Sequence, residues 1–140
     1  MFLIDTNVVS EFRKIHVGKA DINVTRWSEQ TPASDMFLSV VTILELEIGI
    51  LRLERRDSFQ ARQLRTWLTD YILPGFDGQV IPVSMEVAQA SAAYHIPDPA
   101  PFRDAFIAAT AQVHGLTVVT PNTADFQRCG VPLLNPWLPQ

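Results

Sequence analysis

The chain has 140 residues, 47% hydrophobic and 19% charged, so it is long enough to bury a core and too apolar to be disordered. A single cysteine, Cys129, excludes an internal disulfide, and the absence of a signal-like opening or a bilayer-length apolar run predicts a cytoplasmic protein with no membrane partner. The net charge of −4 disfavours a polyanionic partner, unless several of the 15 acids bind divalent cations.

Short apolar runs alternate with amphipathic segments along residues 1–140, which read as a single domain. This alternation predicts an α/β fold, with helix layers on both faces of a central, mainly parallel sheet of about five strands. A proline at position 82 is unfavourable in a central strand, so we expect the third strand to lie at an edge of that sheet or to bend at its end. The predicted strands are 2–4, 36–41, 80–83, 116–120 and a small edge strand at 131–134. The predicted helices are 8–14, 22–30, 42–56 with Thr42 as its N-cap, 59–73, 84–94 with Ser84 as its N-cap, 102–114 and a short turn at 122–126.

Asp5 lies where the first strand gives way to the first helix. In open α/β sheets, ligands and catalytic groups collect at the carboxyl ends of the strands. The simpler interpretation is that Asp5 only caps the helix, because Asp is a common N-cap residue. The balance between these interpretations depends on the rest of the chain.

Three further acids lie at corresponding places. Glu45 stands among apolar residues near the start of the helix after the second strand, Asp104 lies in the first turn of an alanine-rich helix, and Asp125 follows the strand at 116–120. Each also has a simpler interpretation as a first-turn acid that the helix dipole favours. Parallel strands end at one edge of a sheet, so the four carboxylates are expected to meet there.

Carboxylates that meet repel one another unless they are protonated or bind cations, and sites made only of oxygen prefer Mg²⁺ or Mn²⁺. The cluster therefore predicts a metal site. Two ions about 3.5 to 4 Å apart, or one ion with a water, can hydrolyse a phosphodiester. We expect Thr6 and Asn7 to satisfy the amino end of the first helix, which leaves Asp5 free to face the ion.

The segment 52–65 carries five of the 11 basic residues. Clustered arginines suit contacts with phosphates. The simpler interpretation is a solvated helical hairpin with Glu54 and Asp57 as local ion-pair partners. The residues concerned are Arg52, Arg55, Arg56, Arg62 and Arg65.

Four stretches together resemble the PIN-domain family, in the order in which that family carries them. The resemblance is strongest to the VapC-type toxins of toxin–antitoxin pairs, and the ending 135–137 is similar to their FitB-like branch. It covers nearly the whole chain. The stretches are Leu-Ile-Asp-Thr-Asn with Ser10-Glu11, then residues 39–49, 104–111 and 120–126.

This resemblance implies a PIN-like three-layer α/β/α domain that acts as a metal-dependent endoribonuclease. It implies an RNA substrate and a homodimer. It also implies a small cognate antitoxin that inhibits the toxin, and operator DNA is then bound only through this antitoxin. Asp5 and Asp104 match the principal Mg²⁺ ligands, and Glu45 matches the acid after the second strand. The residues that match polar groups shaping the pocket are Thr6, Asn7 and Thr120.

The fourth acid departs from the family pattern. Some relatives carry an aspartate where Asn122 stands and others carry an acid where Asp125 stands, and here only the latter position is acidic. We take Asp125 as the fourth acid, with Asn122 in a position to orient it or a water. Pro121 stands where family members often have a basic residue, so one phosphate contact is absent.

A function from a different class stays open, namely a catalytically inactive PIN-like module that binds RNA or an antitoxin. Other enzyme chemistries lack their motifs, since the chain has no phosphate-binding P-loop and no nucleophile elbow. An aspartyl phosphatase would need a second aspartate at position 7, where Asn7 stands. The three histidines are scattered and lack the spacing of a zinc site: His16, His95 and His114.

Overall fold

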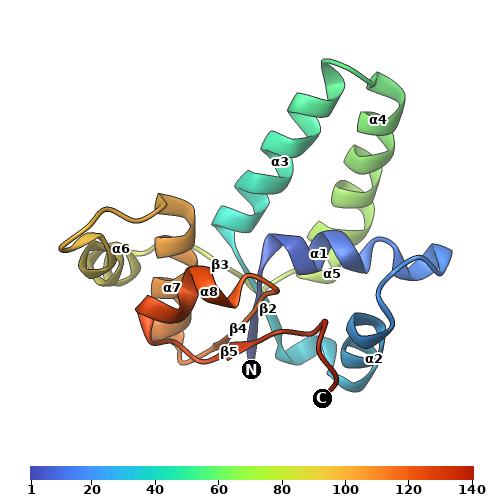
Figure 1. Cartoon of the computed structure of the whole chain (residues 1–140). Coiled ribbons are helices and arrows are strands. Elements are labelled where there is room, and N and C mark those ends of the chain that lie inside the picture. Colours follow the sequence, from blue (N-terminus) through green and yellow to red (C-terminus); the bar gives the residue numbers. More distant parts are fainter.

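Five parallel strands form the centre of the molecule, in a computed structural model that describes residues 1–140 (Figure 1). Their order across the sheet is β3-β2-β1-β4-β5, and every neighbouring pair is parallel. The predicted parallel α/β sheet of about five strands is therefore confirmed. The strands are β1 (Phe2–Ile4), β2 (Met36–Ser39), β3 (Val80–Ile81), β4 (Thr117–Val119) and β5 (Leu133–Leu134).

Helices and turns occupy most of the remaining chain. α2 has the bounds that the sequence predicts, and the predicted helix at 59–73 divides into α4, a π-helical turn at Leu68–Ile72 and α5. Short 3₁₀ turns lie at Ile15–Val17, Ala33–Asp35, Ala93–His95 and Gln127–Cys129. The α-helices are α1 (Thr6–Phe12), α2 (Ile22–Gln30), α3 (Val40–Glu54), α4 (Ser58–Trp67), α5 (Leu73–Gly75), α6 (Met85–Ala92), α7 (Phe102–His114) and α8 (Thr123–Phe126).

The sheet has a separate apolar core on each face, which makes the domain three-layered. Successive residues of a strand point to opposite faces. Ile4 accordingly packs with residues of α1 to α4, whereas Leu3 packs with residues of α7 and α8. Val119 and Val118 of β4 divide between the two cores in the same way. The three-layer α/β/α architecture is thus confirmed.

The strand order creates a switch point between β1 and β4. The chain moves from β1 to β2 and then β3 on one side, and returns across the sheet to place β4 on the other side of β1. The carboxyl ends of β1 and β4 therefore lie side by side. The chain continues from β1 into α1 on one face of the sheet and from β4 into α8 on the other face. In open α/β sheets, ligands bind in the crevice at such a point.

The start of α3 differs from the sequence prediction, which continued the strand to residue 41 and used Thr42 as the cap. The strand ends at Ser39, whose Oγ accepts a hydrogen bond of 3.0 Å from the Val41 N–H and caps the helix. A serine at the strand end offers its side-chain oxygen to the helix as soon as the backbone turns. Thr42 consequently lies inside α3 and is buried.

The paired helices α3 and α4 rise from the body of the domain (Figure 1). β3 and β5 form the two edges of the sheet, as predicted, and Pro82 follows the last residue of β3. Ser84 caps α6 by accepting a 3.2 Å hydrogen bond from the Val87 N–H, as predicted. No helix combines the length and the apolar composition that crossing a membrane requires.

Candidate active site at the switch point

Asp5 lies at the switch point, one residue beyond the β1–β4 ladder. The ladder pairs Ile4 with Val119, and the Asp5 N–H continues it with a 3.0 Å hydrogen bond to the Val119 carbonyl. This register brings the side chain of Thr120 against Asp5, and the Thr120 hydroxyl donates a 2.8 Å hydrogen bond to Asp5 Oδ2. Asp5 is only 6% exposed, so the sheet fixes this carboxylate in a nearly dry position.

The predicted division of labour at the start of α1 is wrong. Asp5 is itself the N-cap, and its Oδ1 accepts a 2.8 Å hydrogen bond from the Thr6 N–H. Its extended backbone conformation, with φ −70° and ψ 155°, turns the carboxylate toward the helix end, while Asn7 is exposed and forms no side-chain hydrogen bond. Each carboxylate oxygen accepts one hydrogen bond from protein and retains a free lone-pair position for a ligand.

Thr6 links α1 to α3. Its hydroxyl donates a 3.0 Å hydrogen bond to Glu45 Oε1 and lies 3.3 Å from the hydroxyl of Thr42. Glu45 is half-buried, so this contact orients a carboxylate that burial would otherwise destabilise. Thr42 was not among the residues selected from the sequence; its only signal there is a position three residues before Glu45, on the same helix face.

The four acids are close enough to influence one another. The charge of Asp125 acts on Asp5 and Asp104, and the charges of Asp5 and Asp104 act on Glu45. Asp104 is half-buried at the start of α7, and Asp125 is exposed in α8. The structure therefore brings the acids selected from the sequence to one end of the sheet.

Burial and mutual repulsion both act against the charged forms of these acids. Burial raises the pKa of Asp5, and the nearby charge of Asp125 raises it further, against the opposing hydrogen bonds from Thr120 and Thr6. The pKa values of Glu45 and Asp104 are also raised, in each case first by burial and then by neighbouring carboxylates. The negative charges of these carboxylates are therefore not balanced by nearby positive charges.

Carboxylate oxygens without enough positive charge nearby are suitable ligands for a hard divalent cation. Asp5, Glu45, Asp104 and Asp125 supply only carboxylate oxygens, so their donor set fits such an ion. They do not converge on one point, because no three His, Cys, Asp or Glu side chains are disposed to enclose a metal ion.

Arg103 is a charged residue of the site that sequence reasoning missed. Its guanidinium lies 3.8 Å from Glu45 Oε2, and it lowers the pKa values of both Glu45 and Asp104. The signal in the sequence is a basic residue in the first turn of a helix, where the dipole disfavours it. Arg103 neutralises only part of the cluster's negative charge.

Asn122 does not hold Asp125 through its side chain. The Asn122 N–H donates a 3.0 Å hydrogen bond to the Thr120 hydroxyl, and its carbonyl accepts a 3.1 Å hydrogen bond from the Asp125 N–H. The Asn122 side chain is exposed and caps nothing. Its influence on Asp125 is therefore through the backbone of the turn.

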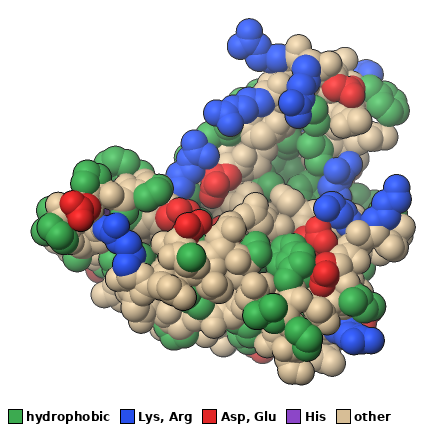
Figure 2. Space-filling model, in the orientation of Figure 1, with side chains coloured by type: hydrophobic (Ala, Val, Ile, Leu, Met, Phe, Trp, Pro, Cys, Tyr) green, Lys and Arg blue, Asp and Glu red, His purple; other side chains and the backbone are tan.

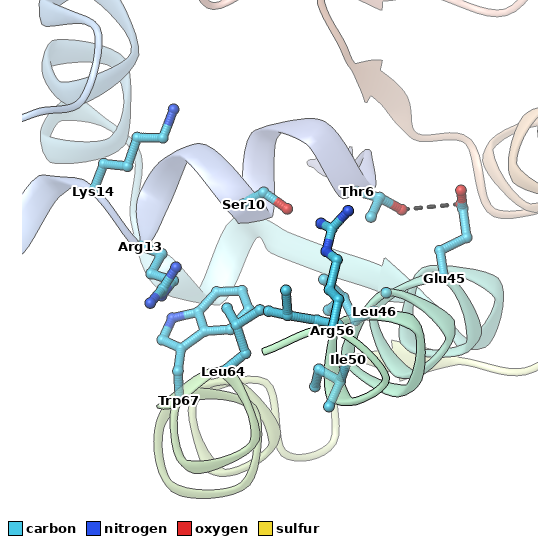
Figure 3. A pocket seen from close by; sticks show the side chains of 12 residues that line it. Thr6, Ser10, Arg13, Lys14, Glu45, Leu46, Ile50, Arg56, Leu64 and Trp67 are labelled. Carbon is cyan, nitrogen blue, oxygen red and sulfur yellow. Dashed lines mark hydrogen bonds between the residues drawn. The ribbon is translucent and has the colours of Figure 1, made fainter. Parts of the chain in front are cut away.

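A cleft of about 370 Å³ opens beside Thr6 and Glu45, between α1, α3 and α4 (Figure 3). We call it the α1–α3–α4 cleft. On the other side of the acids, Asp104 and Asp125 line a smaller cavity of about 260 Å³. The residues that line the α1–α3–α4 cleft are Thr6, Ser10, Arg13, Lys14, Glu45, Leu46, Gly49, Ile50, Leu53, Arg56, Leu64 and Trp67.

The arginines at 52–65 have different surroundings in the structure. Only Arg56 lines the cleft, and Arg65 instead forms a 2.8 Å ion pair with Glu47, which joins α4 to α3. The local ion pairs expected with Glu54 and Asp57 do not form. Spacing along the chain could not show this, because the two helices pack antiparallel and bring residues 18 positions apart together.

A parallel three-layer α/β/α domain with acidic side chains near its switch point is the class of protein that the fold and the site define. Residues 2–131 match the family model described as PIN domain. The chain is 33% identical to VapC ribonuclease Y4jK of Sinorhizobium fredii, over 99% of each chain, and 34% identical to Toxin FitB of Neisseria gonorrhoeae, over 98% of this chain and 99% of that one. The solved structure of FitAB bound to an IR36 DNA fragment superposes with a TM-score of 0.86 at 30% identity, over 100% of this chain and 98% of that one.

The chain belongs to the PIN-domain family. The resemblance stated from its motifs is thereby confirmed, together with the PIN-like fold.

Proposed function

We propose that this protein is a metal-dependent endoribonuclease and the toxin of a toxin–antitoxin pair. The observation that carries the proposal is the position of Asp5, which is buried at the switch point and within electrostatic reach of Asp125, Glu45 and Asp104. Support for RNA as the substrate comes from full-length similarity to a VapC ribonuclease.

Asp5 and Asp104 would hold Mg²⁺ or Mn²⁺, with Glu45 and Asp125 as further candidate ligands. The ion supplies a Lewis acid that stabilises charge on the scissile phosphate and favours deprotonation of the attacking water. Thr120 and the amino end of α1 orient Asp5 by hydrogen bonds to its two oxygens. Thr6 orients Glu45 by a hydrogen bond to Oε1, and the Arg103 guanidinium lies 3.8 Å from Oε2, so two groups fix the carboxylate that would face the ion or accept a proton from water.

The test is cleavage of a structured RNA by the purified protein with Mg²⁺, with EDTA, and in Asp5→Asn and Asp104→Asn variants. We expect cleavage that requires the metal and is lost in both variants. Cleavage that survives EDTA and both substitutions would reject the metal mechanism. Metal-dependent cleavage lost in both variants would reject the alternative of an inactive RNA- or antitoxin-binding module.

The partners in this proposal are a cognate antitoxin protein and, only through it, operator DNA. Support comes from the likeness to Toxin FitB and to FitAB bound to DNA. A short neighbouring reading frame that encodes a small DNA-binding protein would supply the candidate. Co-purification of its product with this chain, together with DNA binding by the complex and not by this chain alone, is the expected result. We place this activity in the cytoplasm.

Homodimerisation is also part of the proposal. A surface groove of about 530 Å³ is lined almost wholly by apolar side chains, and Leu44 and Phe102 on it are 51% and 68% exposed. Apolar patches of this kind mark association surfaces. The groove adjoins Glu45 and Asp104 in sequence and is lined by Val40, Val41, Leu44, Val83, Phe102, Arg103 and Phe106.

A further inference from the structure

The α1–α3–α4 cleft begins at the acids and leads away from them. Thr6 and Glu45, which are joined by a 3.0 Å hydrogen bond, line one end of it, while Arg13 and Trp67 lie at the other (Figure 3). Because Glu45 belongs both to the candidate site and to the cleft wall, a group that fills the cleft lies next to the reacting phosphate. The cleft is thus positioned to bind a part of the substrate that flanks the bond to be cut.

The floor of the cleft is apolar. Leu46 and Ile50 of α3 are 8% and 2% exposed, and Leu64 and Trp67 of α4 close the side opposite α1. An apolar floor with an indole side chain at its wall suits the face of a nucleobase, since aromatic side chains stack on bases of any identity. Ser10, which is exposed on α1 and has no hydrogen-bond partner in the protein, presents a hydroxyl to the same space (Figure 3).

The rim of the cleft is basic. Arg13 and Lys14 lie at the end of α1 and Arg56 lies beyond the end of α3, whereas Glu45 is the only acid among the lining residues. Lys14 pairs with Glu11 at 2.9 Å, but Arg13 and Arg56 are exposed and form no ion pair. Lysines and arginines gather on this side of the molecule, around the hollow beside α3 and α4 (Figure 2). In a chain of net charge −4, this rim offers phosphates a local positive field.

We propose that this cleft is a nucleotide subsite for single-stranded RNA, adjacent to the scissile phosphate. The base lies on the apolar floor against Trp67, the flanking phosphates contact Arg13 and Arg56, and the Ser10 hydroxyl hydrogen-bonds the edge of the base and contributes to base preference. This inference rests on the proposed function, because it takes RNA as the substrate. Of the arginines in residues 52–65 that the sequence suggests for phosphate contacts, only Arg56 contributes to this subsite.

The first test measures binding without cleavage. Labelled oligouridylate and oligoadenylate are titrated in EDTA at several salt concentrations, with wild type, Arg13→Gln, Arg56→Gln and the control Arg26→Gln on α2. We expect each cleft variant to bind about tenfold more weakly, and its slope of log K against log salt to fall by about 0.7 for one lost phosphate contact. Arg26→Gln is expected to match wild type, and cleft variants that also match wild type would overturn the proposal.

The second test concerns the base. Trp67→Leu is expected to weaken binding of both oligonucleotides while the salt slope stays unchanged, because stacking carries no charge. Trp67→Phe keeps an aromatic face and is expected to retain most of the affinity, which separates loss of stacking from loss of folding. Ser10→Ala is expected to change the ratio of the two affinities. Equal affinity of Trp67→Leu and wild type for the oligonucleotides would show that the base does not bind in the cleft.

Cleavage assays separate this inference from the proposed function. If wild type cuts no RNA with any divalent metal, the proposed function fails, and binding in EDTA still decides whether the cleft is an RNA site. If wild type cuts RNA and the Arg13 and Arg56 variants cut it with unchanged kcat/KM, the subsite fails and the proposed function stands. If those variants bind RNA normally but lose a protein partner, the cleft is a protein-binding site and the RNA proposal is overturned.

Discussion

The hydroxyl of Thr120 donates a 2.8 Å hydrogen bond to Asp5 Oδ2, across 115 residues of sequence and inside the buried switch point between β1 and β4. The bond ties a carboxylate at the end of one strand to the first residue beyond its neighbour. The same hydroxyl accepts a hydrogen bond from the Asn122 N–H and thereby also stabilises the turn that leads to Asp125. One side chain therefore positions two of the four acids.

Thr120→Val should lower both stability and activity, because it removes the donor to Asp5 and the acceptor for the Asn122 N–H. We expect roughly 1 to 2 kcal/mol less free energy of unfolding in urea, and slower RNA cleavage. Thr120→Ser, which keeps the hydroxyl, should recover most of the rate.

The matched control for Thr120 is Thr110→Val. Thr110 is a buried threonine whose hydroxyl donates to the Phe106 carbonyl at 2.7 Å in α7, away from the acids. Equal cleavage rates in Thr120→Val and Thr110→Val would show that Thr120 contributes only to stability.

Asp125→Asn should reduce kcat/KM for RNA cleavage at least tenfold, if Asp125 is the fourth acid of the site. The comparison variant is Glu47→Gln, since Glu47 pairs with Arg65 on the exposed side of α3. That substitution should leave cleavage nearly unchanged and cost less than about 1 kcal/mol of stability. A larger loss of activity in Glu47→Gln than in Asp125→Asn would reject the assignment.

Metal binding should be visible without an activity assay, as a rise in melting temperature. At Mg²⁺ concentrations about a hundredfold above Kd, binding to the folded state alone stabilises by about 2.7 kcal/mol. Asp104→Asn should abolish most of this shift. It should nevertheless melt above wild type in EDTA, because burial and the repulsion by Asp5 and Asp125, which together raise the pKa of Asp104, no longer act on a charged side chain. Asp77→Asn, at an exposed position in the turn before β3, is the control and should behave as wild type in both conditions.

Glu11 should make stability depend on pH in the acid range. Its pKa is lowered from 4.5, first by the hydrogen bond from the Asp21 N–H and also by Lys14, so the unfolded state binds this proton more tightly. The stabilisation is therefore present above pH 4.5 and is lost as the pH falls through the lowered value.

Urea unfolding of Glu11→Gln at several pH values measures this effect. We expect a deficit of roughly 1 kcal/mol at neutral pH, which shrinks below pH 4.5 and closes as the pH falls through the lowered pKa of Glu11. Glu29→Gln, exposed on α2, serves as the control. A deficit that is the same at all pH values would show that ionisation of Glu11 is not its source.

Leu44→Asn and Phe102→Asn should weaken self-association, because both place a polar amide on the exposed apolar groove. Sedimentation equilibrium is expected to show a dimer for wild type and a larger monomer fraction for each variant. Leu138→Asn, which changes an equally exposed leucine in the C-terminal tail, should leave the dimer intact. A wild-type monomer at all concentrations would refute the homodimer.

Local patterns in the sequence were sufficient for the class of fold. The bounds of α2, the Ser84 cap, the edge position of β3 and the placement of Asp5 at a strand end all depend on residues within a few positions of one another. Periodicity, capping chemistry and proline geometry act over that range, so they can be read directly. The four acids were found in the same way, each as a residue at the end of an element.

Where two neighbouring residues could each cap a helix, tertiary contacts determine which of them does so. Ser39 and Thr42 are both good caps, and the packing of Val41 in the core under α7 selects Ser39. Asp5, not Thr6, caps α1 because the β1–β4 register draws Asp5 to Thr120 and α3 draws the Thr6 hydroxyl to Glu45. The spacing of residues along the sequence does not indicate any of these long-range contacts.

The short apolar run before Asp5 was enough to place that residue at the carboxyl end of a buried strand. Contacts between distant parts of the chain made this strand end the switch point, and they allow Asp5 both to cap α1 and to accept a hydrogen bond from the Thr120 hydroxyl. They also form the cleft beside Thr6 and Glu45 that Arg13 and Trp67 line at its other end. The reason is physical. Strand order, register and helix packing are set by the cores on the two faces of the sheet, which join residues far apart in the sequence.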